Sequence, residues 1–209
     1  MQIGSQAVLI AVLHRCRSRR AAMASGLLFA TTWLCATFWW LFISMHTYGD
    51  LAWPLAALAV GALAAALAVY YALAAGVYWH LRERSAWARV TAFAALWTAA
   101  EMARGTWLTG FGWGAIGYAH ADGPLAVAIP WVGVYGVGAL AAGVAAALAP
   151  ASGTRATRLA AVALLAFGWA GTAWNTSSTE SVGMVSVTLL QGNIPQDEKF
   201  QPGSGVPMA

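Results

Sequence analysis

Two ionisable residues, Glu101 and Arg104, interrupt an apolar run at residues 90–108. Their i, i+3 spacing places both side chains on one face of a helix, where they can form an ion pair. Ionisable groups inside a membrane-spanning segment are costly, and they indicate a functional site by default. The alternative is a buried ion pair that only locks neighbouring helices together. The two residues alone leave both interpretations open.

A glycine-rich loop follows this pair, at residues 110–118 (GFGWGAIGY). Three of its glycines match the G-x-G-x-x-G pattern formally: Gly112, Gly114 and Gly117. A dinucleotide-binding fingerprint also needs a preceding strand and an acidic residue about 20 positions further on. Here an apolar run precedes the loop, and no acidic residue lies near position 137. The glycines alternate with three aromatic residues, Phe111, Trp113 and Tyr118. We predict an interfacial or re-entrant loop that contacts lipid and packs against protein.

Three other residues carry side chains that could do chemistry. His46 is a candidate general base, but an isolated histidine at a membrane interface is more often structural. Cys16 lies among arginines, which favour its thiolate, yet the sequence shows no base partner for it. Cys35, in the middle of an apolar run, is interpreted as a small apolar residue. We therefore predict no catalytic residue, no metal site and no cofactor in this chain.

The elements that position these residues follow from composition. The chain has 209 residues, of which 60% are hydrophobic and 9% are charged. These values exclude a soluble globular domain and a disordered chain, and two cysteines exclude a disulfide scaffold. The predicted fold class is an all-α multi-pass membrane helix bundle. Five runs are long enough to cross a bilayer, counting flanking residues for the last: 21–45, 51–78, 90–108, 125–149 (with a kink expected at Pro130) and 159–174.

The basic residues predict the orientation of this bundle. Nine of the eleven lie before the first run, between the second and third, and between the fourth and fifth. These loops are therefore predicted to be cytoplasmic, and the chain after residue 174 exoplasmic. The positive charge is interpreted as a topology signal, so no nucleic-acid partner is expected. Residues 1–20 are interpreted as the remnant of an upstream membrane helix followed by a basic cytoplasmic loop.

The composition changes after the last run. Residues 175–181 are polar, and residues 182–190 alternate in the β-branched pattern of a strand. Residues 191–196 (QGNIPQ) then provide a turn. Residues 175–209 are therefore interpreted as an exoplasmic linker and the start of a truncated α/β domain, and we expect the chain to be a fragment.

Three segments together resemble apolipoprotein N-acyltransferase, a bacterial inner-membrane enzyme of lipoprotein maturation in the nitrilase-like superfamily. Residues 40–49 (WLFISMHTYG) look like the family's first outer loop. Residues 101–118 (EMARGTWLTGFGWGAIGY) are similar to its E-x-x-R-G…T-G-F-P-W…G-Y signature, with Gly112 in place of the proline. Residues 187–199 (VTLLQGNIPQDEK) look like the first strand of its periplasmic nitrilase-like domain. Phe200 stands where the family commonly has tryptophan.

The resemblance implies transfer of an acyl chain from a phospholipid to the N-terminal diacylglyceryl-cysteine of a lipoprotein, through a cysteine thioester. The implied partners are a phospholipid donor, a diacylglyceryl-lipoprotein acceptor and membrane lipid. The family's catalytic glutamate, lysine and cysteine have no counterpart in these residues, so we expect the fragment itself to be inactive. The candidate lipid or loop contacts are Glu101, Arg104, Trp107, Phe111, Trp113 and Tyr118.

The role of Arg104 has two interpretations. It orients a phospholipid phosphate, or it supports the loop at residues 110–118 with Glu101 as its partner. Two other classes of protein also fit the composition. A fragment of a solute transporter would show internal repeats and polar residues at the bilayer midplane. A non-catalytic membrane scaffold would leave the QGNIPQ segment unexplained.

Overall fold

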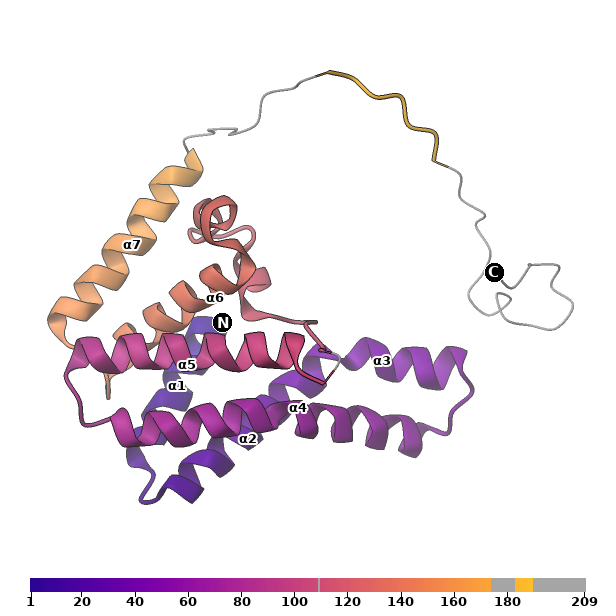
Figure 1. Ribbon diagram of the computed structural model, residues 1–209, viewed down its shortest axis with the longest axis horizontal. Helices are drawn as coiled ribbons and strands as arrows, with labels where there is room; N and C mark the ends of the chain where they lie inside the picture. The colour runs from indigo at the N-terminus through magenta and orange to yellow at the C-terminus, as the bar shows by residue number, and fades with distance from the viewer. Residues whose placement is uncertain (109, 174–182, 190–209) are drawn as a thin grey trace, which may run out of the picture.

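The computed structural model describes residues 1–108, 110–173 and 183–189. Within these residues the chain is all-helical, and the predicted helical fold class is confirmed. The described part of the chain contains seven α-helices (Figure 1): α1 (Gln2–Arg15), α2 (Arg19–Thr37), α3 (Trp39–Ile43), α4 (Trp53–Leu81), α5 (Ala86–Thr106), α6 (Ile129–Leu148) and α7 (Arg155–Ala173). Three short segments join them: the π-helical η1 (Ser44–Tyr48) and the 3-10 helices η2 (Ile116–His120) and η3 (Ala126–Ala128).

Each predicted apolar run contains a helix, but fewer helices qualify as spans than we predicted. Within the described residues, two are long and apolar enough to cross a membrane, Trp53–Leu81 and Ala126–Leu148. A third qualifies if α2 and the α3–η1 pair are counted as one bent span. The helices α5 and α7 do not meet this test, so the five-span count stays a prediction.

Local sequence explains where several helices begin. The Ser18 hydroxyl accepts a hydrogen bond from the Ala21 amide at 3.2 Å and caps α2. The Ser85 hydroxyl accepts one from the Ala88 amide at 3.4 Å and caps α5. Such caps satisfy amides that have no partner inside the helix. Pro54 lies in the first turn of α4, where a missing N–H costs little.

The run at 21–45 is bent rather than a single straight helix. The bend between α2 and the α3–η1 pair measures 54°. Thr37 Oγ1 donates to the Trp33 carbonyl at 2.9 Å, and this kind of back-bonding bends helices. At the bend, the buried Phe38 packs edge-on against Phe111, with 5.0 Å between ring centroids. The bend therefore seats the glycine-rich loop.

Two further predictions are corrected. The break in α6 lies at Gly133, with φ 63° and ψ −175°. Pro130 lies in the first turn of that helix, where its missing N–H would have no helical partner, so it does not break the helix. The predicted strand at 182–190 does not form in its described part, because residues 183–189 adopt neither helix nor strand. A strand needs partner strands, and the described residues supply none. The predicted linker at 175–181, the turn at 191–196 and Phe200 lie outside the described residues.

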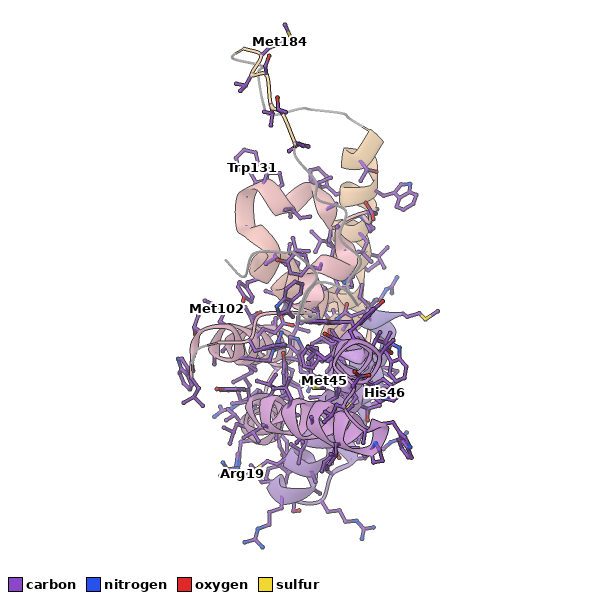
Figure 2. The ribbon with its side chains drawn as sticks, turned by 90° about the vertical axis from the view of Figure 1, so that its right-hand side faces the viewer. Arg19, Met45, His46, Met102, Trp131 and Met184 are labelled. Carbon is purple, nitrogen blue, oxygen red and sulfur yellow. The ribbon has the colours of Figure 1, made fainter. Side chains whose placement is uncertain are left out.

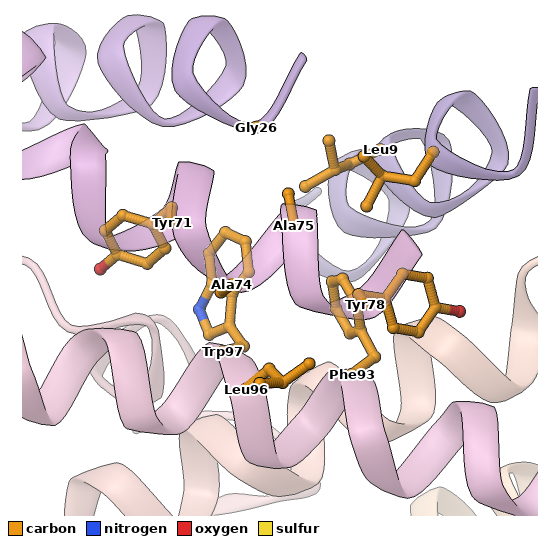
Figure 3. A pocket seen from close by; sticks show the side chains of 10 residues that line it. Leu9, Gly26, Tyr71, Ala74, Ala75, Tyr78, Phe93, Leu96 and Trp97 are labelled. Atoms are coloured by element: carbon orange, nitrogen blue, oxygen red, sulfur yellow. The ribbon is translucent and has the colours of Figure 1, made fainter. Parts of the chain in front are cut away.

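Close helix contacts depend on small residues. A Cβ atom at Gly26 of α2 would lie 2.6 Å from Ala75 Cβ of α4, so only glycine permits this approach. Aromatic rings fill the centre (Figure 3), where Tyr71 and Trp97 lie 4.8 Å apart between centroids. The cavity beside them has a volume of about 10 Å³, which is at the lower limit for one water molecule. The core is therefore tightly packed.

The α1–α2, α4–α5 and α6–α7 turns meet at one end of the bundle (Figure 1). We call them the basic turns, because nine arginines lie in or beside them. The Trp79 indole of α4 donates to the Cys16 carbonyl in the α1–α2 turn at 2.9 Å. Arg89 of α5 donates to the Ser152 carbonyl in the α6–α7 turn at 2.8 and 3.2 Å. The glycine-rich loop lies at the far end of α5. The three turns that are predicted to lie on the same side of the membrane therefore lie at the same end of the bundle. That this side is the cytoplasm stays a prediction.

Large apolar side chains cover much of the surface. Trp131 is 84% exposed and Met102 is 50% exposed, and both project away from the helices (Figure 2). Soluble proteins rarely expose large contiguous apolar surfaces. A surface of this kind is what lipid contact requires.

Candidate functional site

Arg104 is the centre of the candidate site. Its side chain is 1% exposed, near the C-terminal end of α5. One terminal nitrogen, Nη1, donates to the carbonyl oxygens of Phe111 at 2.6 Å and Trp113 at 2.8 Å. Nε donates to the Tyr71 hydroxyl of α4 at 3.0 Å. In return, the Phe111 amide donates to the Arg104 carbonyl at 2.8 Å. Arg104 therefore holds the loop against two helices.

Glu101 holds a second point of the same loop. Its side chain is fully buried, and Oε1 accepts a hydrogen bond from the Ile116 amide at 2.9 Å. The other oxygen, Oε2, has no hydrogen-bond partner. It lies against α6, because a Cβ atom at Gly138 would come within 3.3 Å of it. The indole Nε1 of Trp97, one turn earlier on α5, is also buried without a hydrogen-bond partner among the described residues.

The expected Glu101–Arg104 ion pair is not formed. In the described part of the chain, the one pair of opposite charges within 4.0 Å is Arg82–Glu83, at 3.2 Å. Instead, each of the two buried groups hydrogen-bonds to backbone atoms of the loop. The i, i+3 spacing does place both on one face, but that face meets the loop. Backbone groups of the loop pair with Glu101 Oε1 and Arg104 Nη1, and Oε2 and Nη2 have no hydrogen-bond partner among the described residues.

The glycines of the loop serve close packing. Gly114 has a φ of +74°, a left-handed conformation that other residues rarely adopt, and a Cβ there would collide with the Thr37 methyl group. At Gly117 a Cβ would collide with the Val134 carbonyl oxygen of α6. The loop is thus wedged between α2 and α6, which agrees with rejecting the formal dinucleotide match.

The predicted aromatic contacts divide into two groups. Phe111 points into the bundle, where it packs against Phe38. Trp107, Trp113 and Tyr118 are each about two-thirds exposed, at 65%, 64% and 65%. Trp113 also lies beside Trp40 of α3, at 5.6 Å between centroids. One ring therefore anchors the loop, and three remain on the surface.

The other candidates do not join this site. The His46 ring lies on the exposed η1 segment, with Nδ1 2.9 Å from the Leu51 carbonyl. Cys16 Sγ contacts the Ser25 hydroxyl at 3.7 Å in a basic turn. Cys16 and Cys35 are free thiols. Within the described ranges, no group of three or more His, Cys, Asp or Glu residues could hold a metal ion.

Residue-by-residue reading of the sequence missed three members of the site. Tyr71 accepts a hydrogen bond from Arg104, although it lies 33 positions earlier in the sequence. Its hydroxyl group in an alanine-rich apolar run was a signal from which a buried polar contact could have been predicted. Gly138 gives α6 access to the Glu101 carboxylate. The Tyr135 hydroxyl lies over Gly105, where a Cβ atom would come within 2.6 Å of it. The latter two contacts carry no local signal.

The fold and site define a helical membrane domain that fixes an aromatic loop through two buried charged side chains. Residues 2–147 match the family described as Apolipoprotein N-acyltransferase N-terminal domain. The chain belongs to this family, and it is accordingly a membrane protein.

Three curated relatives are similar along nearly the whole chain, and each is named apolipoprotein N-acyltransferase. The protein of Verminephrobacter eiseniae is 47% identical over 232 aligned positions, covering 100% of this chain and 42% of the relative. That of Ralstonia nicotianae is 45% identical and covers 96% and 39%. That of Nitrosomonas europaea is 38% identical and covers 94% and 40%. The chain therefore spans about 40% of the length of these relatives.

Proposed function

We propose that this chain is the membrane platform of an apolipoprotein N-acyltransferase in the bacterial inner membrane. The observation that carries the proposal is the Arg104–Glu101 hold on the loop, in a chain whose residues 2–147 match that family. In this proposal five segments cross the bilayer, and the basic turns face the cytoplasm. The loop then lies at the periplasmic surface.

The proposed task of the platform is to present lipid to an acyl-transfer site that the chain's own residues do not supply. Trp107, Trp113 and Tyr118 are exposed at one end of the bundle and suit the headgroup region, where amphipathic rings concentrate. A cleft of about 680 Å³ opens beside Trp113 and Tyr118, bounded by Val134 and Tyr135 of α6. Cleft and rings together form a surface for a phospholipid donor or a diacylglyceryl-lipoprotein acceptor.

Arg104 acts in this proposal as a positioning residue for the loop. Its side chain is 1% exposed, and its Nε and Nη1 atoms are occupied by Tyr71, Phe111 and Trp113. The third nitrogen, Nη2, is buried and has no hydrogen-bond partner among the described residues, so a phosphate would have to enter the protein interior to reach it. The support role therefore accounts for the geometry better than phosphate binding does.

The test uses the whole protein that contains this chain, reconstituted in phospholipid vesicles with a synthetic diacylglyceryl-cysteine lipopeptide. Mass spectrometry should show the lipopeptide gaining one acyl chain as an amide, with one lysophospholipid formed for each product. A lipopeptide of unchanged mass, with the protein folded and inserted, would instead favour the membrane scaffold or the transporter interpretation.

A further inference from the structure

A second cavity lies behind the loop, between the start of α1 and helices α2 and α5. Its volume is about 380 Å³, within the range of small-molecule sites. Four aromatic side chains contribute to its wall, beside smaller and polar residues: Phe29 and Trp33 from α2, Trp97 from α5 and Tyr118 from η2. Such a wall suits an acyl chain.

One polar side chain in this wall is buried without a partner. Gln6 of α1 is 1% exposed, and within the described part of the chain neither its Oε1 nor its Nε2 atom has a hydrogen-bond partner. Leaving both halves of a buried amide unpaired is costly, and native structures almost always satisfy such groups. Its neighbour Gln2 uses Oε1 to contact His120 Nε2 at 2.7 Å, while Gln2 Nε2 also lacks a partner. The cavity therefore offers both hydrogen-bond donors and an acceptor.

The chemistry of the wall selects an uncharged polar group attached to an apolar chain. Among the described residues, no acidic or basic side chain lines the cavity, and the charged N-terminal amine belongs to Met1, which lines it but is fully exposed. The Gln6 amide can donate from Nε2 to an ester carbonyl and accept at Oε1 from a hydroxyl. The glycerol region of an intact diacyl phospholipid has acceptors only. A monoacyl glycerolipid carries an ester beside a free hydroxyl.

We propose that this cavity binds a monoacyl glycerolipid, with Gln6 pairing its ester carbonyl and free hydroxyl and the aromatic wall holding its acyl chain. The inference rests on the proposed function for the source of this lipid. Removal of one acyl chain from a phospholipid donor leaves a lysophospholipid of this kind. The charged headgroup would extend through the open side of the cavity. The platform thus holds the deacylated product apart from the fresh donor.

The test measures binding to the 209-residue chain, so its outcome is separate from that of the acyl-transfer assay. The protein in detergent would be titrated with lysophosphatidylethanolamine, monoacylglycerol or diacyl phosphatidylethanolamine. Native mass spectrometry would measure the fraction of protein that carries each lipid. We expect both monoacyl lipids to bind more tightly than the diacyl lipid. Gln6→Leu should weaken monoacyl binding about tenfold, the loss expected for one or two buried hydrogen bonds, and leave diacyl binding unchanged.

Two further variants keep the result interpretable. Ser5, exposed at the cavity wall, can be replaced by phenylalanine to obstruct the cavity without touching Gln6, and Ser5→Phe should also weaken monoacyl binding. Thr32→Leu makes a matched polar-to-leucine change on the exposed face of α2 and should change nothing. Equal binding of monoacyl and diacyl lipids would overturn the proposal. The proposal would also be overturned if Gln6→Leu raised the stability of the protein and left lipid binding unchanged. Water alone would then fill the cavity.

Discussion

Replacing Arg104 by methionine is the sharpest perturbation of the site. The change keeps an unbranched side chain but removes three hydrogen bonds, to Tyr71, Phe111 and Trp113. Hydrogen bonds in membrane proteins contribute about 0.6 kcal/mol each on average and about 1.7 kcal/mol at most. The expected loss in the free energy of unfolding is therefore about 2 kcal/mol, with an upper limit of about 5 kcal/mol.

The assay combines denaturant unfolding in detergent with hydrogen exchange followed by mass spectrometry. Exchange should rise at the Phe111 and Ile116 amides, because the loop loses its hold on α5. Arg104→Lys should recover only part of the stability, since a single ammonium cannot reproduce the planar guanidinium fork. Arg84→Met, at an exposed arginine in a basic turn, is the matched control and should change stability by less than about 0.5 kcal/mol. A loss as small as that control's, with unchanged loop exchange, would refute the reasoning.

Three more predictions concern the loop and its surroundings. Glu101→Leu should lower the free energy of unfolding by about 1–3 kcal/mol by leaving a buried amide unpaired, whereas Glu101→Gln keeps an acceptor and should cost less; equal losses in denaturant titrations would contradict this. Gly117→Ala should destabilise the protein by about 1–3 kcal/mol, because the added Cβ would collide with backbone atoms. Gly61→Ala, where the added Cβ on α4 meets open space, is the control and should be neutral or stabilising. Thermal unfolding of the two variants makes the comparison. Burial, with a smaller contribution from the N-terminal amine, lowers the pKa of His120, so the folded state binds its proton less readily than the unfolded state. The melting temperature should therefore fall as the pH drops below about 6.5, and His120→Asn should flatten that fall; an unchanged slope would show that His120 contributes nothing.

The helices could be predicted from the sequence because long apolar runs have few alternatives in a membrane. Every backbone polar group must be satisfied internally there, and a helix does this within one segment. The bend at Phe38 was not predicted, because its local signal, a threonine hydroxyl bonded to the preceding turn, is weak. The packing of Phe38 against Phe111, more than 70 residues away in sequence, exists only in the folded chain. The strand predicted at 182–190 is absent from its described part, residues 183–189, because alternating side chains cannot form a strand without a neighbouring strand.

The site was predicted in part. The cost of placing charge in an apolar run singled out Glu101 and Arg104, and the structure buries both side chains against the loop. The ion pair between them was predicted wrongly, because a sequence identifies side chains but not which backbone groups will face them. Support of the loop by Arg104 was one of the two interpretations that the sequence left open. The contacts to Phe111 and Trp113 exist only once the loop folds back over α5. The proposed lipid contacts of the exposed aromatic residues stay a prediction.

The most direct test of the central claim is the side of the membrane on which the loop lies. With every native cysteine of the whole protein replaced by alanine, Cys16 and Cys35 included, single cysteines at Asp122 and Arg84 mark the segment after the loop and a basic turn, and both positions are exposed. Intact bacterial cells expressing the whole protein would be treated with a membrane-impermeant maleimide. We predict labelling of Asp122→Cys and none of Arg84→Cys until the cells are opened. Labelling of Arg84→Cys in intact cells, with Asp122→Cys protected, would place the loop in the cytoplasm and contradict the account.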